Sequence, residues 1–118
     1  MANSNIPLLT GAALFTSTTV GATAIAVSAA SNVIYEMELD NTANAAATYL
    51  RMYNTGSVTV GTTVPDWIVM IPASTKITLV LPSGVTFGTA LTLSAGTSAT
   101  LATTTAPSSA FALKIVYV

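Results

Sequence analysis

The residues that could do chemistry are few, and the densest group lies on one short segment. Glu36, Glu38 and Asp40 alternate with apolar residues, and a period of two places alternate side chains on one face of a β-strand. Three carboxylates on one face could hold a divalent cation, but calcium usually takes about six to eight oxygen ligands from several positions. The simpler interpretation is a solvated strand face, paired across strands with Arg51 or Lys114.

A second candidate is a carboxylate beside the only tryptophan, at Asp66 and Trp67. An indole face next to a carboxylate is the minimum that could stack on a sugar ring and bind its hydroxyl groups. A tryptophan that opens an apolar run, here residues 67–71, is more often a core residue. We favour the core interpretation and keep the sugar site as an alternative.

A third group combines aromatic rings with a positive charge. Tyr49, Arg51 and Tyr53 share one face of the strand expected at residues 48–53. Aromatic residues and arginine are enriched at protein interfaces. We therefore predict that these three residues form an interface patch rather than a catalytic site.

The sequence contains no histidine and no cysteine. This excludes disulfides, the usual zinc sites and catalysis by Ser-His-Asp or Cys-His groups. General acid or base chemistry would have to use the few carboxylates, a lysine or a tyrosine, and no phosphate-binding loop or nucleophile elbow is present. We predict that the chain is not an enzyme and has no catalytic residue, bound metal or cofactor.

Charge is scarce along the whole chain. Only 6% of the 118 residues are charged, with three basic and four acidic side chains, whereas about a quarter is average. Three basic residues cannot neutralise a row of phosphates, so we predict no nucleic-acid partner. The exterior must be made from the 21 Thr, 11 Ser and 20 Ala, or it is hidden against other chains.

Hydrophobic residues make up 52% of the chain, and its mean hydropathy is +0.71. Serine and threonine interrupt the uncharged stretches, so none offers the roughly 18 consecutive apolar residues of a spanning helix. Residues 11–30 end in small residues, as secretory signals do, but lack their positively charged start. We predict no membrane partner and no secretory signal.

Alternating apolar and polar residues predict strands, most clearly at 33–40, 76–81 and 111–118. The apolar run at 67–71 predicts a strand covered on both faces, and residues 82–84 predict a turn. Short strands with no helical period favour one antiparallel β-sandwich or small barrel. A short strand is expected at 57–60, and weaker strands at 13–16, 24–28, 85–87 and 90–95. The expected core residues are Val33, Tyr35, Met37, Leu39, Leu50, Met52, Trp67, Val69, Ile71, Ile77, Leu79, Leu81, Phe111, Leu113 and Ile115.

The first 31 residues are uncharged and have no obvious core of their own. We predict that residues 1–31 form an extended arm and residues 32–118 the sandwich domain. Such arms add strands to sheets or run across their surfaces, and the sequence leaves open whether this one pairs within its own chain or with another. On this hypothesis, deletion of residues 1–31 leaves residues 33–118 folded but abolishes binding to a larger assembly.

Three segments carry a resemblance to a known class of proteins. They are ELDNTANAAATYLRMYN at 38–54, VTVGTTVPD at 58–66 and LKIVYV at 113–118. The region from Val33 to Val118 resembles small virion proteins of tailed phages of aquatic bacteria. The resemblance implies a β-sandwich or jelly-roll subunit on the particle surface, commonly a capsid decoration (cement) protein. It contains no active-site motif, so it maps no functional residue.

We therefore expect a structural virion protein that decorates the outer capsid surface and stabilises contacts between major capsid subunits. Its expected partners are its own copies, as a homo-oligomer with a trimer as the leading form, and the major capsid protein. One alternative is a tail, neck or fibre-base component of the particle. Others are a bacterial surface adhesin or pilin-like subunit, and a sugar-binding module.

Overall fold

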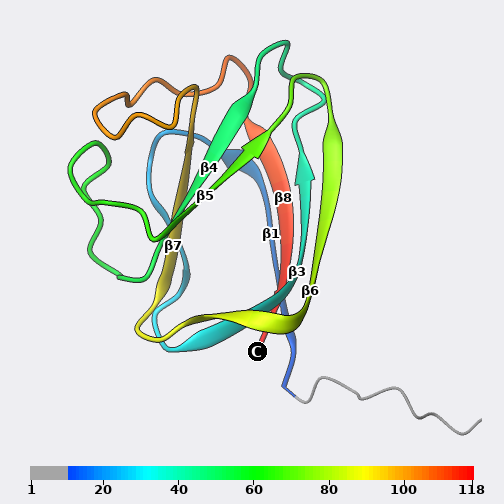
Figure 1. The fold of residues 1–118 in the computed structure, drawn as a ribbon, viewed down its shortest axis with the longest axis vertical. Helices are drawn as coiled ribbons and strands as arrows, with labels where there is room; N and C mark the ends of the chain where they lie inside the picture. Colours follow the sequence, from blue (N-terminus) through cyan, green and yellow to red (C-terminus); the bar gives the residue numbers. More distant parts are fainter. Residues whose placement is uncertain (1–10) are drawn as a thin grey trace, which may run out of the picture.

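The computed structural model describes residues 11–118 (Figure 1). These residues form two four-stranded antiparallel sheets, which confirms the predicted all-β sandwich. No helix within residues 11–118 is long and apolar enough to cross a membrane. Sheet A has the order β1-β8-β3-β6 and sheet B the order β2-β7-β4-β5. The strands are β1 (Ala13–Val20), β2 (Ile25–Ser28), β3 (Asn32–Asp40), β4 (Thr48–Tyr53), β5 (Trp67–Ile71), β6 (Lys76–Phe87), β7 (Leu91–Gly96) and β8 (Phe111–Tyr117).

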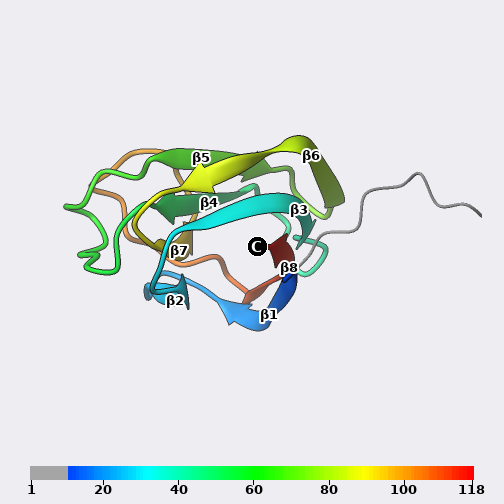
Figure 2. The same ribbon diagram turned by 90° about the horizontal axis from the view of Figure 1, so that it is seen from below.

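The strands pair in a nested order. The hairpin β4–β5 lies in sheet B, the pair β3–β6 in sheet A, the pair β2–β7 in sheet B and the pair β1–β8 in sheet A. The chain is therefore one long antiparallel ribbon that folds back at the β4–β5 hairpin, and its successive strand pairs belong alternately to sheet B and sheet A. Figure 2 shows the two sheets side by side, with β5, β4, β7 and β2 in one and β6, β3, β8 and β1 in the other.

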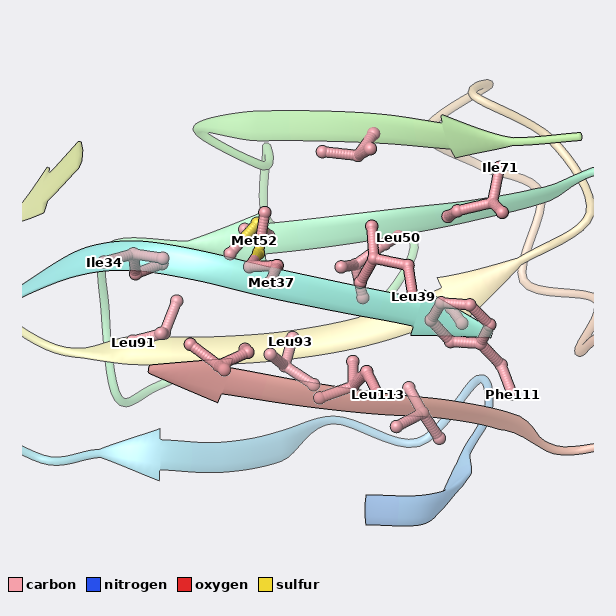
Figure 3. Packing of buried hydrophobic residues seen from close by; sticks show 14 of the residues in the cluster. Ile34, Met37, Leu39, Leu50, Met52, Ile71, Leu91, Leu93, Phe111 and Leu113 are labelled. Carbon is pink, nitrogen blue, oxygen red and sulfur yellow. The ribbon is translucent and has the colours of Figure 1, made fainter. Parts of the chain in front are cut away.

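The core lies between the inner faces of the two sheets. Figure 3 shows side chains of β3 and β8 meeting those of β4 and β7. Every predicted core residue except Val33 and Tyr35 belongs to this cluster, with Trp67, Ile77, Leu79 and Leu81 partly buried at its margin. The cluster also contains residues that the sequence did not single out: Val20, Ile34, Phe87, Leu91, Leu93 and Ala95.

The core position on β3 that we assigned to Tyr35 belongs to Ile34, which is fully buried. The cause is a register shift in the pairing of β3 with both neighbours between Ile34 and Glu36. A bulge adds a residue to one strand and reverses the alternation of its side chains. Ile34 and Met37 therefore both point into the core, although they are three residues apart and strict alternation would place them on opposite faces.

The turn predicted at residues 82–84 is wrong, because β6 continues through it. β3 pairs with β6 on both sides of this segment, as Glu36 opposite Val80 and Ile34 opposite Val85. The extra residues of β6 bulge out, with Gly84 at φ +73°. A Cβ atom on Gly84 would lie 2.4 Å from Cγ1 of Val33, so only glycine fits without a shift. Figure 1 shows β6 bending here, as strands do at bulges.

The apolar run Trp67–Ile71 forms a strand, but the prediction that both of its faces are covered is wrong. β5 pairs only with β4 and lies at the edge of sheet B. Its Met70 side chain is 50% exposed. The short strand expected at 57–60 is also wrong, since these residues belong to the connection between β4 and β5.

The predicted N-terminal arm is not confirmed. Residues 1–10 lie outside the described part of the chain, and Gly11 onward enters the sandwich. β1 pairs with β8 and β2 pairs with β7 of the same chain. Val20 at the end of β1 is completely buried in the core. Most of the segment that we assigned to an arm therefore completes both sheets of its own domain.

Candidate functional site

The charged side chains gather on the outer face of sheet A. Of the seven in the sequence, five lie there, because they alternate with inward-facing core residues on β3, β6 and β8. The remaining two are Arg51, which is buried, and Asp66, which is exposed before β5. The five are Glu36, Glu38, Asp40, Lys76 and Lys114. We call this surface the charged face.

Ion pairs cross the charged face between neighbouring strands. Glu38 Oε1 lies 3.3 Å from Lys76 Nζ and 4.0 Å from Lys114 Nζ, so the predicted pairing with Lys114 is confirmed and that with Arg51 is wrong. The lysines are more than half exposed, and such surface pairs contribute only a few tenths of a kcal/mol each. Within residues 11–118, no group of three or more potential ligand residues is placed to hold a metal ion.

Two hydrogen bonds and a nearby lysine lower the pKa of the Asp40 carboxyl group on the charged face. The Thr42 hydroxyl and backbone N–H both donate to its carboxylate, at 2.5 and 3.0 Å, and lower the pKa of Asp40. The nearby Lys76 acts in the same direction. Hydrogen bonds to the charged form of a carboxyl group favour ionisation.

Replacement of Thr42 by alanine is expected to raise the pKa of Asp40, because the larger of these stabilising hydrogen bonds disappears. A pKa lowered by folding stabilises the protein above the unfolded-state pKa, and this contribution is lost as pH falls through the folded-state pKa. The acid limb of the stability profile should therefore lie at higher pH in Thr42→Ala. Carboxyl carbon NMR titration measures the pKa directly, and an unchanged value would show that the hydrogen bond has no effect.

The predicted interface patch is largely inside the protein. Arg51 is 1% exposed and Tyr53 is fully buried, whereas Tyr49 is half-buried. The Tyr53 hydroxyl lies 3.2 Å from Ser94 Oγ, across the β4–β7 pair. The three side chains thus form no exposed patch, and an interface through Tyr49 stays a prediction.

Arg51 holds the segment that follows β7. Its Nη2 donates to the backbone carbonyls of Ser98, Thr100 and Thr103, at 2.8, 2.8 and 2.7 Å. No acidic side chain among residues 11–118 forms a salt bridge with it. The positive charge of Arg51 is therefore compensated by carbonyl dipoles of the residue 97–110 loop. These hydrogen bonds hold the loop over sheet B.

The residue 97–110 loop and the residue 54–66 loop together cover the outer face of sheet B. All six residues of β7 are buried, although alternate side chains of a strand point to opposite faces. Thr92 Oγ1 donates to the carbonyl of Thr55 at 2.7 Å. The two loops also touch, since a Cβ atom on Gly61 would lie 2.8 Å from Cγ2 of Thr104. We call their outer surface the loop face; Figure 1 shows these loops on the side away from sheet A.

A buried polar cluster holds together the end of the sandwich where β3 connects to β4. Asn41 Oδ1 accepts hydrogen bonds from Asn44 Nδ2 at 2.9 Å and Thr48 Oγ1 at 2.6 Å. Asn41 Nδ2 donates to the carbonyls of Ile71 and Pro72. Buried amides that satisfy both functions in this way hold loops in place, so this cluster is structural.

A pocket of about 350 Å³ opens at the end of the sandwich where β4 ends and β5 begins. Its lining brings Asp66 and Trp67 together with Asn54 and residues 85–87 of β6. Trp67 is partly buried against the core cluster, which agrees with its interpretation as a core residue, and it also lines this pocket. Asn54 was not predicted as a site residue, because only the fold brings it next to Asp66 and Trp67.

Comparisons with known proteins add no assignment. No protein-family model, curated protein or solved structure matches the chain.

Proposed function

We propose that this chain is a non-catalytic structural subunit that decorates the outer surface of a virus capsid. The observation that carries the proposal is the segregation of its charges onto the charged face. Most of the remaining exterior is built from Thr, Ser and Ala, which cost less to bury against another protein than unpaired charges do. We propose a capsid as the assembly because the region from Val33 to Val118 resembles small phage virion proteins.

The nested strand pairing supports a finer proposal, that the sandwich is a jelly roll. Eight strands wound as two Greek keys into two sheets define that architecture, which recurs in viral capsid domains. The pairs β1–β8, β3–β6, β2–β7 and β4–β5 alternate between the sheets as this winding requires. Fold alone does not define function, so the jelly roll supports the assembly role without establishing it.

The proposal includes an orientation on the capsid. The charged face points to solvent, and the loop face contacts the major capsid protein. Gly11 to Ser31 is occupied within its own sheets, so the contact comes from buried loop surface rather than from strand addition by these residues. Val64, which is 70% exposed in the residue 54–66 loop, is the largest exposed apolar side chain available there. The proposed decorating unit is a homotrimer.

Two valine substitutions test this orientation as a matched pair. Val64 is 70% exposed on the loop face and Val80 is 65% exposed on the charged face. Val64→Glu is expected to weaken capsid binding at least about tenfold, because it buries an unpaired carboxylate. Val80→Glu is expected to leave binding within about twofold, since exposed surface changes usually have small effects. The measurement is co-sedimentation of each variant with capsids assembled without this chain.

Circular dichroism and thermal unfolding of both variants provide the control for folding. Binding that is lost with Val80→Glu but retained with Val64→Glu would reverse the orientation. Binding unaffected by either substitution would exclude both faces as the capsid contact and remove the main support for the proposal.

A further inference from the structure

The end pocket has a chemical character of its own, although Asn54 and Asp66 of its lining lie at the two ends of the residue 54–66 loop. We propose that it binds a neutral pyranose sugar ring, with Trp67 as the stacking surface and Asp66 and Asn54 as hydrogen-bonding groups. Its volume of about 350 Å³ lies at the small end of the roughly 300 to 1,000 Å³ typical of ligand pockets. This inference does not depend on the capsid proposal.

The polar groups of the pocket are held in place before any ligand arrives. The backbone N–H of Asn54 donates to Asp66 Oδ2 at 2.7 Å. The Asn54 side-chain oxygen in turn accepts from the backbone N–H of Thr89 at 2.8 Å. The backbone N–H of Asp66 donates to the carbonyl of Met52 at 2.9 Å. Fixed groups of this kind lose little conformational entropy when they bind.

These bonds leave hydrogen-bonding capacity for a ligand. The Asp66 side chain is exposed, and a carboxylate has about four acceptor positions, of which one is used by Asn54. The amide of Asn54 has two N–H donors besides its engaged oxygen. A pair of neighbouring sugar hydroxyls can donate to the carboxylate and accept from the amide, and the Thr86 hydroxyl can do both.

The apolar part of the pocket fits the C–H face of a pyranose. Trp67 opens β5 and packs its inner side against the core. Val85 and Phe87 line the pocket from β6, and both belong to or pack against the core cluster. The indole is therefore fixed in orientation by packing, with one part free to the pocket.

Other ligand classes fit less well. The only charged group of the lining is a carboxylate, which repels anions. An alkylammonium ligand would find Asp66 and Trp67, but the cages that recognise such ligands surround the charge with several aromatic rings, and Phe87 is only 2% exposed. The neutral donors and acceptors of Asn54 and Thr86 would remain unused by a cation, whereas sugar hydroxyls pair with them.

The experiment uses the single tryptophan of the chain as a local reporter. The full-length protein is titrated with methyl glucopyranoside, methyl galactopyranoside and methyl mannopyranoside while Trp67 emission is recorded. At least one is expected to change the emission saturably, with a Kd of order 1 mM, and to shift backbone NMR signals of Asn54, Asp66 and Thr86. No saturable change with any of the three sugars would overturn the proposal.

A matched pair of substitutions locates the site. Asp66→Asn keeps an oxygen for the Asn54 N–H but loses the charge, and should weaken sugar binding about tenfold. Asp40→Asn makes the same change on the charged face and should leave Kd unchanged. Equal affinity in all three proteins would place the sugar elsewhere and refute the proposal. Saturable binding of N-acetyllysine methylamide or arginine methyl ester in place of the sugars would refute it in favour of a cation site.

Discussion

Deletion of residues 1–31 is expected to abolish the cooperative folding of the remaining chain. β1 covers the edge of β8 and β2 covers the edge of β7. The deletion also removes Val20, which is fully buried, and Phe15, Ile25 and Val27, which pack against the core. Full burial of such side chains contributes about 1.5 to 3 kcal/mol each, and the total stability of a domain is only about 5 to 15 kcal/mol.

This result contradicts the expectation of a detachable arm, and the two are easily told apart. Removal of residues 1–10 serves as the control, because β1 and β2 remain, and this shorter variant is expected to unfold cooperatively. Circular dichroism, thermal unfolding and NMR dispersion of residues 32–118 make the measurement. A well-dispersed spectrum and a sharp transition for residues 32–118 would show that the two strands are dispensable and that the arm hypothesis is correct.

Arg51→Met is expected to destabilise the protein by about 2 to 4 kcal/mol, since hydrogen bonds to charged groups contribute about 1.5 to 3 kcal/mol each. Methionine retains much of the apolar stem but leaves the carbonyls of Ser98, Thr100 and Thr103 without their donor. These carbonyls regain partners only if the residue 97–110 loop opens to water. The loss is therefore smaller than the sum of the three bonds.

Lys114→Met is the matched control for this substitution. It removes one positive charge from an exposed position, and such changes usually stay within about 0.5 kcal/mol. Urea unfolding gives both values, and amide hydrogen exchange reports on the loop. We expect faster exchange in residues 97–110 of Arg51→Met only. Equal stability of the two variants would mean that Arg51 does not fasten the loop.

The strands that alternate cleanly were predictable from the sequence. Residues 36–40 pair with β8 in sheet A, and in both strands the side chains alternate between the core and solvent. The bulge between Ile34 and Glu36 breaks this alternation at the start of β3, so Ile34 rather than Tyr35 is in the core. Alternation of this kind reports directly on which face is buried. Residues 48–53 were equally clear as a strand, since Leu50 and Met52 point into the core.

Position within a sheet was less predictable than strand identity. The apolar run Trp67–Ile71 predicted a strand covered on both faces, yet it forms β5 at the edge of sheet B, and the strand buried on both faces is β7. β7 contains Thr92 and Ser94 on its outer side and becomes buried only because two loops fold over it. When a loop from elsewhere in the chain covers a strand, the alternation of polar and apolar residues in that strand does not reveal it.

The candidate site was partly visible in the sequence. Asp66 and Trp67 are neighbours in the chain, so the sequence alone showed that they could form a site. Asn54 and Thr86 are distant in the sequence and come next to them only in the folded protein. The sequence predicted Arg51 as an exposed interface residue, because it lies between Leu50 and Met52, whose side chains point into the core, and so faces outward from sheet B. Its actual partners are backbone carbonyls, which residue types do not reveal.

The most direct test of the proposed role is a cryo-electron microscopy reconstruction of the virus particle that contains this chain. We expect its sandwich on the outer capsid surface as a trimer, with the charged face toward solvent and the loop face on the major capsid protein. Density for the chain on the tail, neck or fibre base would contradict decoration and favour that alternative. A filament on a bacterial surface, with no shell, would contradict the virion role altogether.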